Sequence, residues 1–72
     1  MALPDPQTRL LNWRHGIDLS QRAAAIRIGM SQQMLAYIET RKRWPSKRMQ
    51  KRIARSTRIP AAAWVAARKE IA

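Results

Sequence analysis

Apolar and polar positions alternate most regularly between residues 20 and 39, where they predict two short helices separated by a sharp turn. Ser20 and Ser31 each precede an apolar-periodic segment, and a serine hydroxyl at this place accepts a hydrogen bond from an amide that the first helical turn leaves unpaired. Gly29 lies between the two segments. Because glycine adopts the left-handed conformation readily, it is typical of the residue just after a helix.

The two predicted helices each have an inner and an outer face. Ala24 and Ala25 give the first helix little bulk, which allows close crossing at a steep angle, and this is the geometry of a helix-turn-helix. In the second helix Leu35 and Ile38 share the inner face, because residues three apart lie on one side of a helix. The outer face then presents Gln32, Gln33, Ala36 and Tyr37.

Three further helices are expected around this pair. One begins at Asp5-Pro6 and ends near His15, because proline is favoured at the first helical position. Another runs from Pro45-Ser46 to about Ser56, and the last follows Ile59-Pro60. Their predicted core positions are Leu10, Trp13, Ile17, Met49, Ile53 and Trp64. The pattern predicts an all-α chain of five helices, and its 72 residues suffice for a single domain spanning 1–72.

The charge of the chain points to a polyanionic partner. Fifteen basic residues stand against four acidic ones, a formal net charge of +11. No acid occurs between Glu39 and Glu70, whereas nine cations lie between residues 41 and 58. Cations without counter-charges repel one another unless a partner relieves them, and a field of this sign attracts nucleic acid.

Several classes of function are disfavoured by what the sequence lacks. There is no cysteine, and His15 is the only histidine, so we expect neither a metal site nor a cofactor. With four acids there is little from which to assemble a catalytic site, so an enzyme is not expected, and no pattern indicates a small-molecule ligand. No apolar segment suggests a signal peptide or a membrane span, and we expect a cytoplasmic protein.

The order of Gln21, Ala25, Gly29, Leu35 and Ile38 matches the bihelical DNA-binding motif without a gap. With the flanking residues, roughly 8–65 of the chain resembles the Cro/repressor-type (XRE-like) helix-turn-helix domain of phage and bacterial transcriptional regulators. The resemblance implies double-stranded DNA as partner, a homodimer on an inverted-repeat operator, and repression by occupying a promoter. The helix over 32–39 would read bases in the major groove, with the motif itself at about 20–39.

Site residues follow from this resemblance and from side-chain chemistry. Glutamine pairs bidentately with adenine, and a small side chain can meet a thymine methyl. The residues expected to read bases are Gln32, Gln33, Ala36 and Tyr37. Contacts to the DNA backbone are expected from Gln21, Arg22, Ser31, Arg41, Lys42, Arg43, Lys47 and Arg48. Val65 and Ile71 form a possible dimer surface.

Two positions leave alternatives open. Arg41 stands where the family usually has the glycine that closes the reading helix, so either the helix continues through Arg41 or the turn differs. Trp44 precedes Pro45, and it either stacks on nucleic acid or shields the core.

Two other functions compete with regulation by sequence-specific binding. The same fold could serve as a protein-interaction or antitoxin-like module, which would require an acidic or apolar counter-surface. Alternatively, the basic segment over 41–58 could bind polyanions without specificity.

Overall fold

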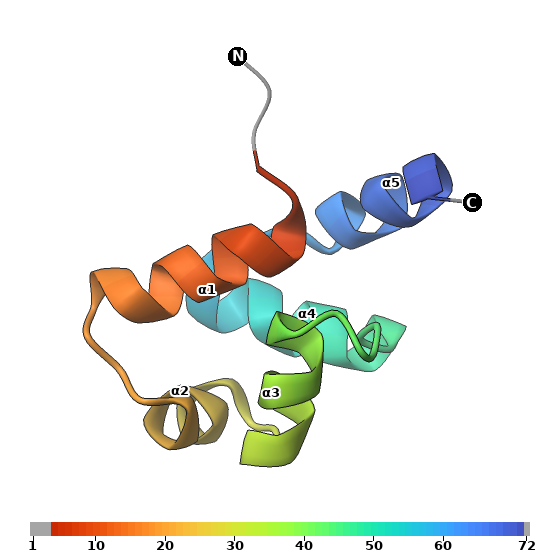
Figure 1. Cartoon of the computed structure of the whole chain (residues 1–72). Coiled ribbons are helices and arrows are strands. Elements are labelled where there is room, and N and C mark those ends of the chain that lie inside the picture. The colour runs from red at the N-terminus through yellow and green to blue at the C-terminus, as the bar shows by residue number, and fades with distance from the viewer. Residues whose placement is uncertain (1–3, 72) are drawn as a thin grey trace.

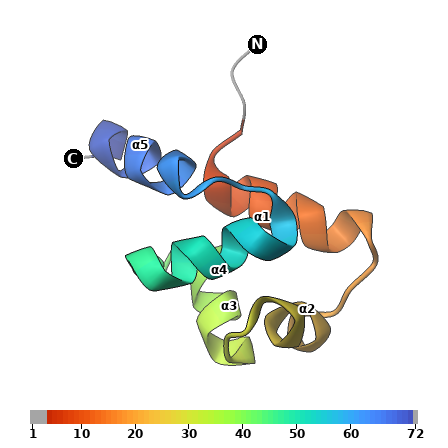
Figure 2. The same cartoon turned by 180° about the vertical axis from the view of Figure 1, so that it is seen from behind.

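The computed structural model describes the backbone of residues 4–71 and the side chains of residues 4–68. Over this range the chain is all-helical, as predicted (Figure 1). The helices are α1 (Pro6–Gly16), α2 (Gln21–Ile28), α3 (Gln32–Glu39), α4 (Lys47–Thr57) and α5 (Ala61–Ile71). In Figure 1, α2 and α3 lie at the bottom, and α5 and the start of α1 lie at the top. Seen from behind in Figure 2, α4 lies in front of α3.

Four of the helices begin at a side-chain cap. Asp5, Ser20, Ser31 and Ser46 each accept a hydrogen bond from the amide three residues later, over 2.9 to 3.1 Å. Each bond satisfies one of the amides that the first helical turn leaves without a partner. The predicted starts of α1 to α4 are therefore confirmed.

A left-handed residue lies in each of the four connections between the helices, and Arg58 (φ 63°) is the one that ends α4. Gly29 (φ 96°) ends α2, Asp18 (φ 56°) lies before it, and Arg41 (φ 65°) follows α3. Neither alternative stated for Arg41 is found, because α3 stops at Glu39 and Arg41 itself adopts the left-handed conformation, with the Lys42 amide donating to the Tyr37 carbonyl over 2.8 Å. The turn keeps the form a glycine would give it, at a conformational cost of about 1–2 kcal/mol for an L-residue.

The core lies where α2 and α3 meet the other three helices. Ala24 and Ala25 are buried at the crossing of α2 with α3, as their small size predicted. Trp13 is half-buried and packs against the core. The buried residues of the core are Leu10, Ala24, Ala25, Ile28, Leu35, Ile38, Ile53, Ile59 and Trp64.

Trp44 packs against the core, so of its two alternatives the structure shows the one in which it shields the core. Its ring meets that of Trp64 edge to face, with ring centroids 5.5 Å apart and an interplanar angle of 87°. This arrangement is one that aromatic pairs prefer. Both indole Nε1 atoms are buried, and neither has a hydrogen-bond partner among the described residues. The packing of the two apolar rings therefore has to compensate for the unpaired N–H groups.

One prediction about burial was wrong, and two buried glutamines were not predicted. Ile17 is 44% exposed, because α1 ends at Gly16 and Ile17 leaves the helical periodicity on which the prediction rested. Gln50, a polar residue of α4, is only 5% exposed. Its Nε2 donates to the Pro45 carbonyl over 3.0 Å, so the amide nitrogen has a hydrogen-bond partner inside the fold. Gln7, at 4% exposure, is a second buried glutamine that the pattern did not reveal.

No helix within residues 4–71 combines the length and apolar character that a membrane crossing requires.

Candidate nucleic-acid interface

The exposed end of α3 is its first turn. Ser31, Gln32 and Gln33 are exposed, whereas Ala36 and Tyr37 are half-buried one turn later. The opposite face carries the buried Leu35 and Ile38. The four residues predicted to read bases therefore lie on the outward side of a helix whose inner side is locked in the core.

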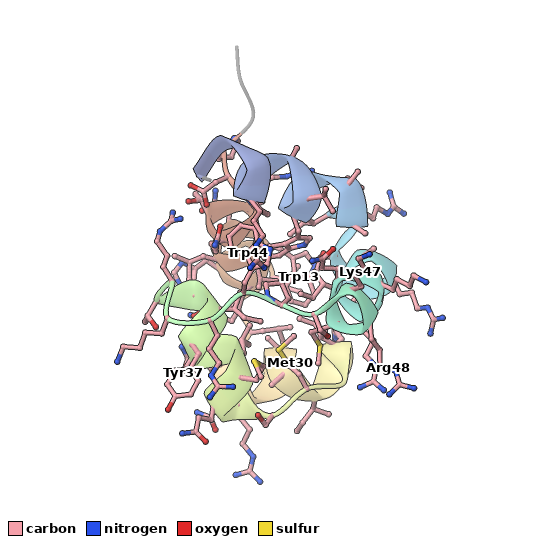
Figure 3. The ribbon with its side chains drawn as sticks, turned by 90° about the vertical axis from the view of Figure 1, so that its right-hand side faces the viewer. Trp13, Met30, Tyr37, Trp44, Lys47 and Arg48 are labelled. Carbon is pink, nitrogen blue, oxygen red and sulfur yellow. The ribbon has the colours of Figure 1, made fainter. Side chains whose placement is uncertain are left out.

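Tyr37 links the exposed face of α3 to the basic loop that follows this helix. Gln33 Nε2 donates to Tyr37 Oη over 2.9 Å, and the Arg43 guanidinium lies 5.5 Å from the centroid of the Tyr37 ring. A cation over an aromatic face is favourable. These side chains border an open hollow of about 200 Å³ that Ser31 and Met34 complete. Tyr37 points outward from α3 at the lower left of Figure 3.

The far end of α3 is anchored by one carboxylate. Glu39 accepts from Arg14 Nε over 2.7 Å and from Arg14 Nη2 over 3.1 Å, and from Gln21 Nε2 over 2.9 Å. Arg14 also donates from Nη1 to the Leu19 carbonyl over 3.0 Å. The side chains of Arg14 and Glu39 are 14% and 5% exposed, so charge-assisted bonds join α1, α2 and α3 largely away from water.

Gln21 therefore has a partner inside the fold. Its half-buried amide nitrogen is held by Glu39, which the sequence alone did not indicate because 18 residues separate the two. The predicted phosphate contact of Gln21 stays a prediction, and it would come from the backbone amides at the start of α2 or from a reoriented side chain.

Most of the cations predicted to touch the DNA backbone point into solvent. Within the part of the chain described with side chains, no carboxylate pairs with Arg22, Lys42, Arg43, Lys47 or Arg48, and all five are exposed. Lys47 and Arg48 extend from the start of α4 on the right of Figure 3.

Arg41 differs from this group. Its Nη2 donates to Asp5 Oδ2 over 2.9 Å and to Thr8 Oγ1 over 3.3 Å, which ties the turn after α3 to the start of α1. Partial burial raises the pKa of the Asp5 carboxyl. The hydrogen bonds from the Thr8 amide and the Arg41 guanidinium lower this pKa by a larger amount, so it lies below its ordinary value. Arg41 is thus occupied within the fold.

The middle of α4 contributes cations that sequence reasoning did not select. Arg52 Nη1 donates to the Gly29 carbonyl over 2.8 Å, at the turn between α2 and α3. Lys51 and Arg55 lie beside it around a second hollow. The signal was present in the sequence, since residues 48, 52 and 55 follow helical spacing along one side of α4.

The predicted dimer residues are only partly described. Val65 is 43% exposed and borders a groove of about 360 Å³ together with Trp44, Pro45 and Lys47. The side chain of Ile71 lies outside the described residues.

The comparisons with known proteins agree with this geometry. Residues 13–64 match the model of a family described as helix-turn-helix, a span that includes α2, the turn at Gly29 and α3. Neither the curated proteins nor the solved structures gave a match. The chain belongs to the helix-turn-helix family, and it carries a DNA-binding regulatory domain of the Cro/repressor type.

Proposed function

We propose that this protein is a sequence-specific transcriptional regulator of double-stranded DNA, which represses by occupying a promoter in the cytoplasm. One observation carries the proposal: α3 exposes two glutamines at its first turn while Glu39 anchors its last turn in the core. A reading helix must present base-pairing groups in a fixed orientation, and this arrangement supports such a role.

The proposed complex places α3 in the major groove. Gln32 and Gln33 would meet base edges, Ala36 would meet a thymine methyl, and Tyr37 would lie toward a sugar or phosphate. The exposed cations of the loop after α3 and of the start of α4 would hold the sugar–phosphate backbone. This division assigns specificity to the glutamines and general affinity to the cations.

We further propose that two copies bind an inverted repeat. A two-fold dimer would place its reading helices about 34–36 Å apart, one turn of DNA. Val65, beside the groove at Trp44 and Pro45, supplies apolar surface for such a contact. The proposed role is regulation, not catalysis.

Changing Gln32 or Gln33 to alanine should cost about 1–3 kcal/mol of binding free energy against a selected operator, because a bidentate base contact is lost. Affinity for scrambled DNA should hardly change. Equilibrium binding to a duplex selected from a random pool, beside a scrambled duplex, measures both quantities.

Lys42→Ala is the matched control for the glutamine variants, because Lys42 is exposed in the loop after α3. It should weaken binding to both duplexes equally and reduce the salt slope of binding by about 1. If the glutamine variants lose equal affinity for both duplexes, α3 does not read sequence. The basic surface then acts as a polyanion binder.

Tyr37→Phe should reduce selectivity at the base that faces Gln33 by about 1 kcal/mol, because it removes the hydroxyl that accepts from the Gln33 amide and keeps the ring beneath Arg43. In a Gln33→Ala background the same change should have no further effect. This double-mutant cycle separates orientation of Gln33 from a direct contact of Tyr37 with DNA, which would make the two changes additive.

A further inference from the structure

One side of α4 carries four cations around a single hollow. Arg48, Lys51, Arg52 and Arg55 line an open space of about 400 Å³, and all four side chains are exposed. Their spacing of three and four residues places them on neighbouring turns of the same side. Lys51, Arg52 and Arg55 have no part in the base-reading surface described above.

Within residues 4–68, no carboxylate forms an ion pair with the cations of this side. The sequence has no acid between Glu39 and Glu70, Glu39 pairs with Arg14, and Asp5 pairs with Arg41. Asp18 is exposed and forms no ion pair with a described residue. Cations one turn apart destabilise a helix, and cations in the first turn of α4 also face the positive end of its dipole. The arrangement is unfavourable for α4 alone, which indicates an anionic ligand.

Hydrogen bonds fix where this side lies relative to α3. Arg52 Nη1 donates to the Gly29 carbonyl over 2.8 Å, and Ser56 Oγ donates to the Arg27 carbonyl over 3.2 Å. The hollow therefore borders the turn that leads into α3. In Figure 3, Arg48 extends at the lower right, Tyr37 lies at the lower left, and Met30 lies between them.

We propose that Arg48, Lys51, Arg52 and Arg55 form a phosphate cradle that holds DNA backbone outside the groove that α3 reads. Three of the four are arginines, whose planar guanidinium matches two phosphate oxygens at once. Arg52 is already held in place by Gly29, so one donor group of the cradle is preorganised. The cradle deepens the proposed function, since it rests on DNA being the ligand. The backbone comes either from the flank of the bound duplex or from a second duplex.

The test is the double variant Lys51→Gln/Arg55→Gln. Neither residue was assigned to the reading surface, and glutamine removes the charge but keeps an unbranched polar side chain and a similar helix propensity. The matched control is Arg9→Gln/Arg68→Gln, which removes the same charge from α1 and α5. Circular dichroism checks that each variant is folded. Binding is measured against salt on two duplexes that carry the same selected site, one ending at the site and one extended by about ten base pairs on each side.

On the extended duplex, the salt slope of the cradle variant should be lower than that of the wild type by about 2, because two phosphate contacts are lost. The ratio of affinities for selected and scrambled sites should not change. If the cradle holds backbone that flanks the site, the cradle variant should not lose the same salt slope on the short duplex, because that duplex ends at the site. If the backbone belongs to a second duplex, a labelled second duplex should be retained by the wild-type complex and released by the variant.

Two results would overturn the cradle. In the first, the cradle variant keeps both the salt slope of the wild type and its retention of a second duplex. In the second, the control variant loses as much salt slope as the cradle variant does. The failure of the proposed function has a different signature. In that case the wild type itself would not distinguish selected from scrambled DNA, whereas the slopes of the variants could still be compared.

Discussion

Glu39→Ala should lower the free energy of unfolding by about 3–5 kcal/mol, because it leaves the largely buried Arg14 guanidinium without its carboxylate. A chain of 72 residues has a stability of about 4–11 kcal/mol at roughly 0.05–0.15 kcal/mol per residue, so a large part of the total would be lost. Gln21 would also lose its acceptor. Urea unfolding followed by circular dichroism measures the change.

A double variant separates the loss of the pair from the isolation of one charge. Arg14→Met with Glu39→Leu removes both charges and keeps side-chain volume, so it should destabilise much less than Glu39→Ala. A cost below about 1 kcal/mol for Glu39→Ala alone would show that this carboxylate does not anchor α3.

Trp64→Ala should destabilise the fold by about 3–5 kcal/mol, because the indole is fully buried and its removal leaves a cavity beneath Trp44. Trp64→Phe should cost much less, since it keeps an aromatic ring and removes an indole nitrogen that has no partner among the described residues. Chemical unfolding gives both values.

Ile17→Ala is the matched control for the Trp64 variants. Ile17 is a large apolar residue that is 44% exposed, so its truncation should change stability by no more than about 0.5 kcal/mol. If Trp64→Ala is as mild as Ile17→Ala, α5 does not close the core.

The elements of the fold were predictable because their signals are local. A cap needs one side chain and an amide three residues later, so Asp5, Ser20, Ser31 and Ser46 could be identified without knowledge of the tertiary structure. The left-handed turn at Gly29 depends in the same way on one residue.

The features that the sequence did not reveal depend on the tertiary surroundings of a residue. Ile17 continued the apolar pattern of α1 in the sequence but lies past its end. Gln50 is polar by type, yet its amide nitrogen donates to the Pro45 carbonyl just before α4, which reduces the penalty of burial. Arg41 finds Asp5 from 36 residues away, and such pairings are set only when the helices pack.

In the candidate site, too, some features follow from local sequence and others depend on how the helices pack. The outward orientation of Gln32 and Gln33 follows from the helical period, and their exposure agrees with it. The contact of Gln33 with Tyr37 joins residues four apart, so the spacing permitted it without selecting it over a solvent-facing rotamer. The bond from Arg52 to Gly29 required the packing of α4 against α2, which no local pattern contains.

The length of α3 limits how much sequence one copy can recognise. Its eight residues lie between left-handed residues at Gly29 and Arg41, so neither end can be extended without rebuilding a turn. At about 1.5 Å per residue the helix spans about 12 Å, the rise of three to four base pairs. Four fully specified base pairs recur by chance about once in every 250 positions, too often to mark one promoter among the many competing sites of a genome. Two copies on adjoining half-sites would multiply these odds to about one in 65,000, which is a statistical reason for an operator longer than a single α3 can cover.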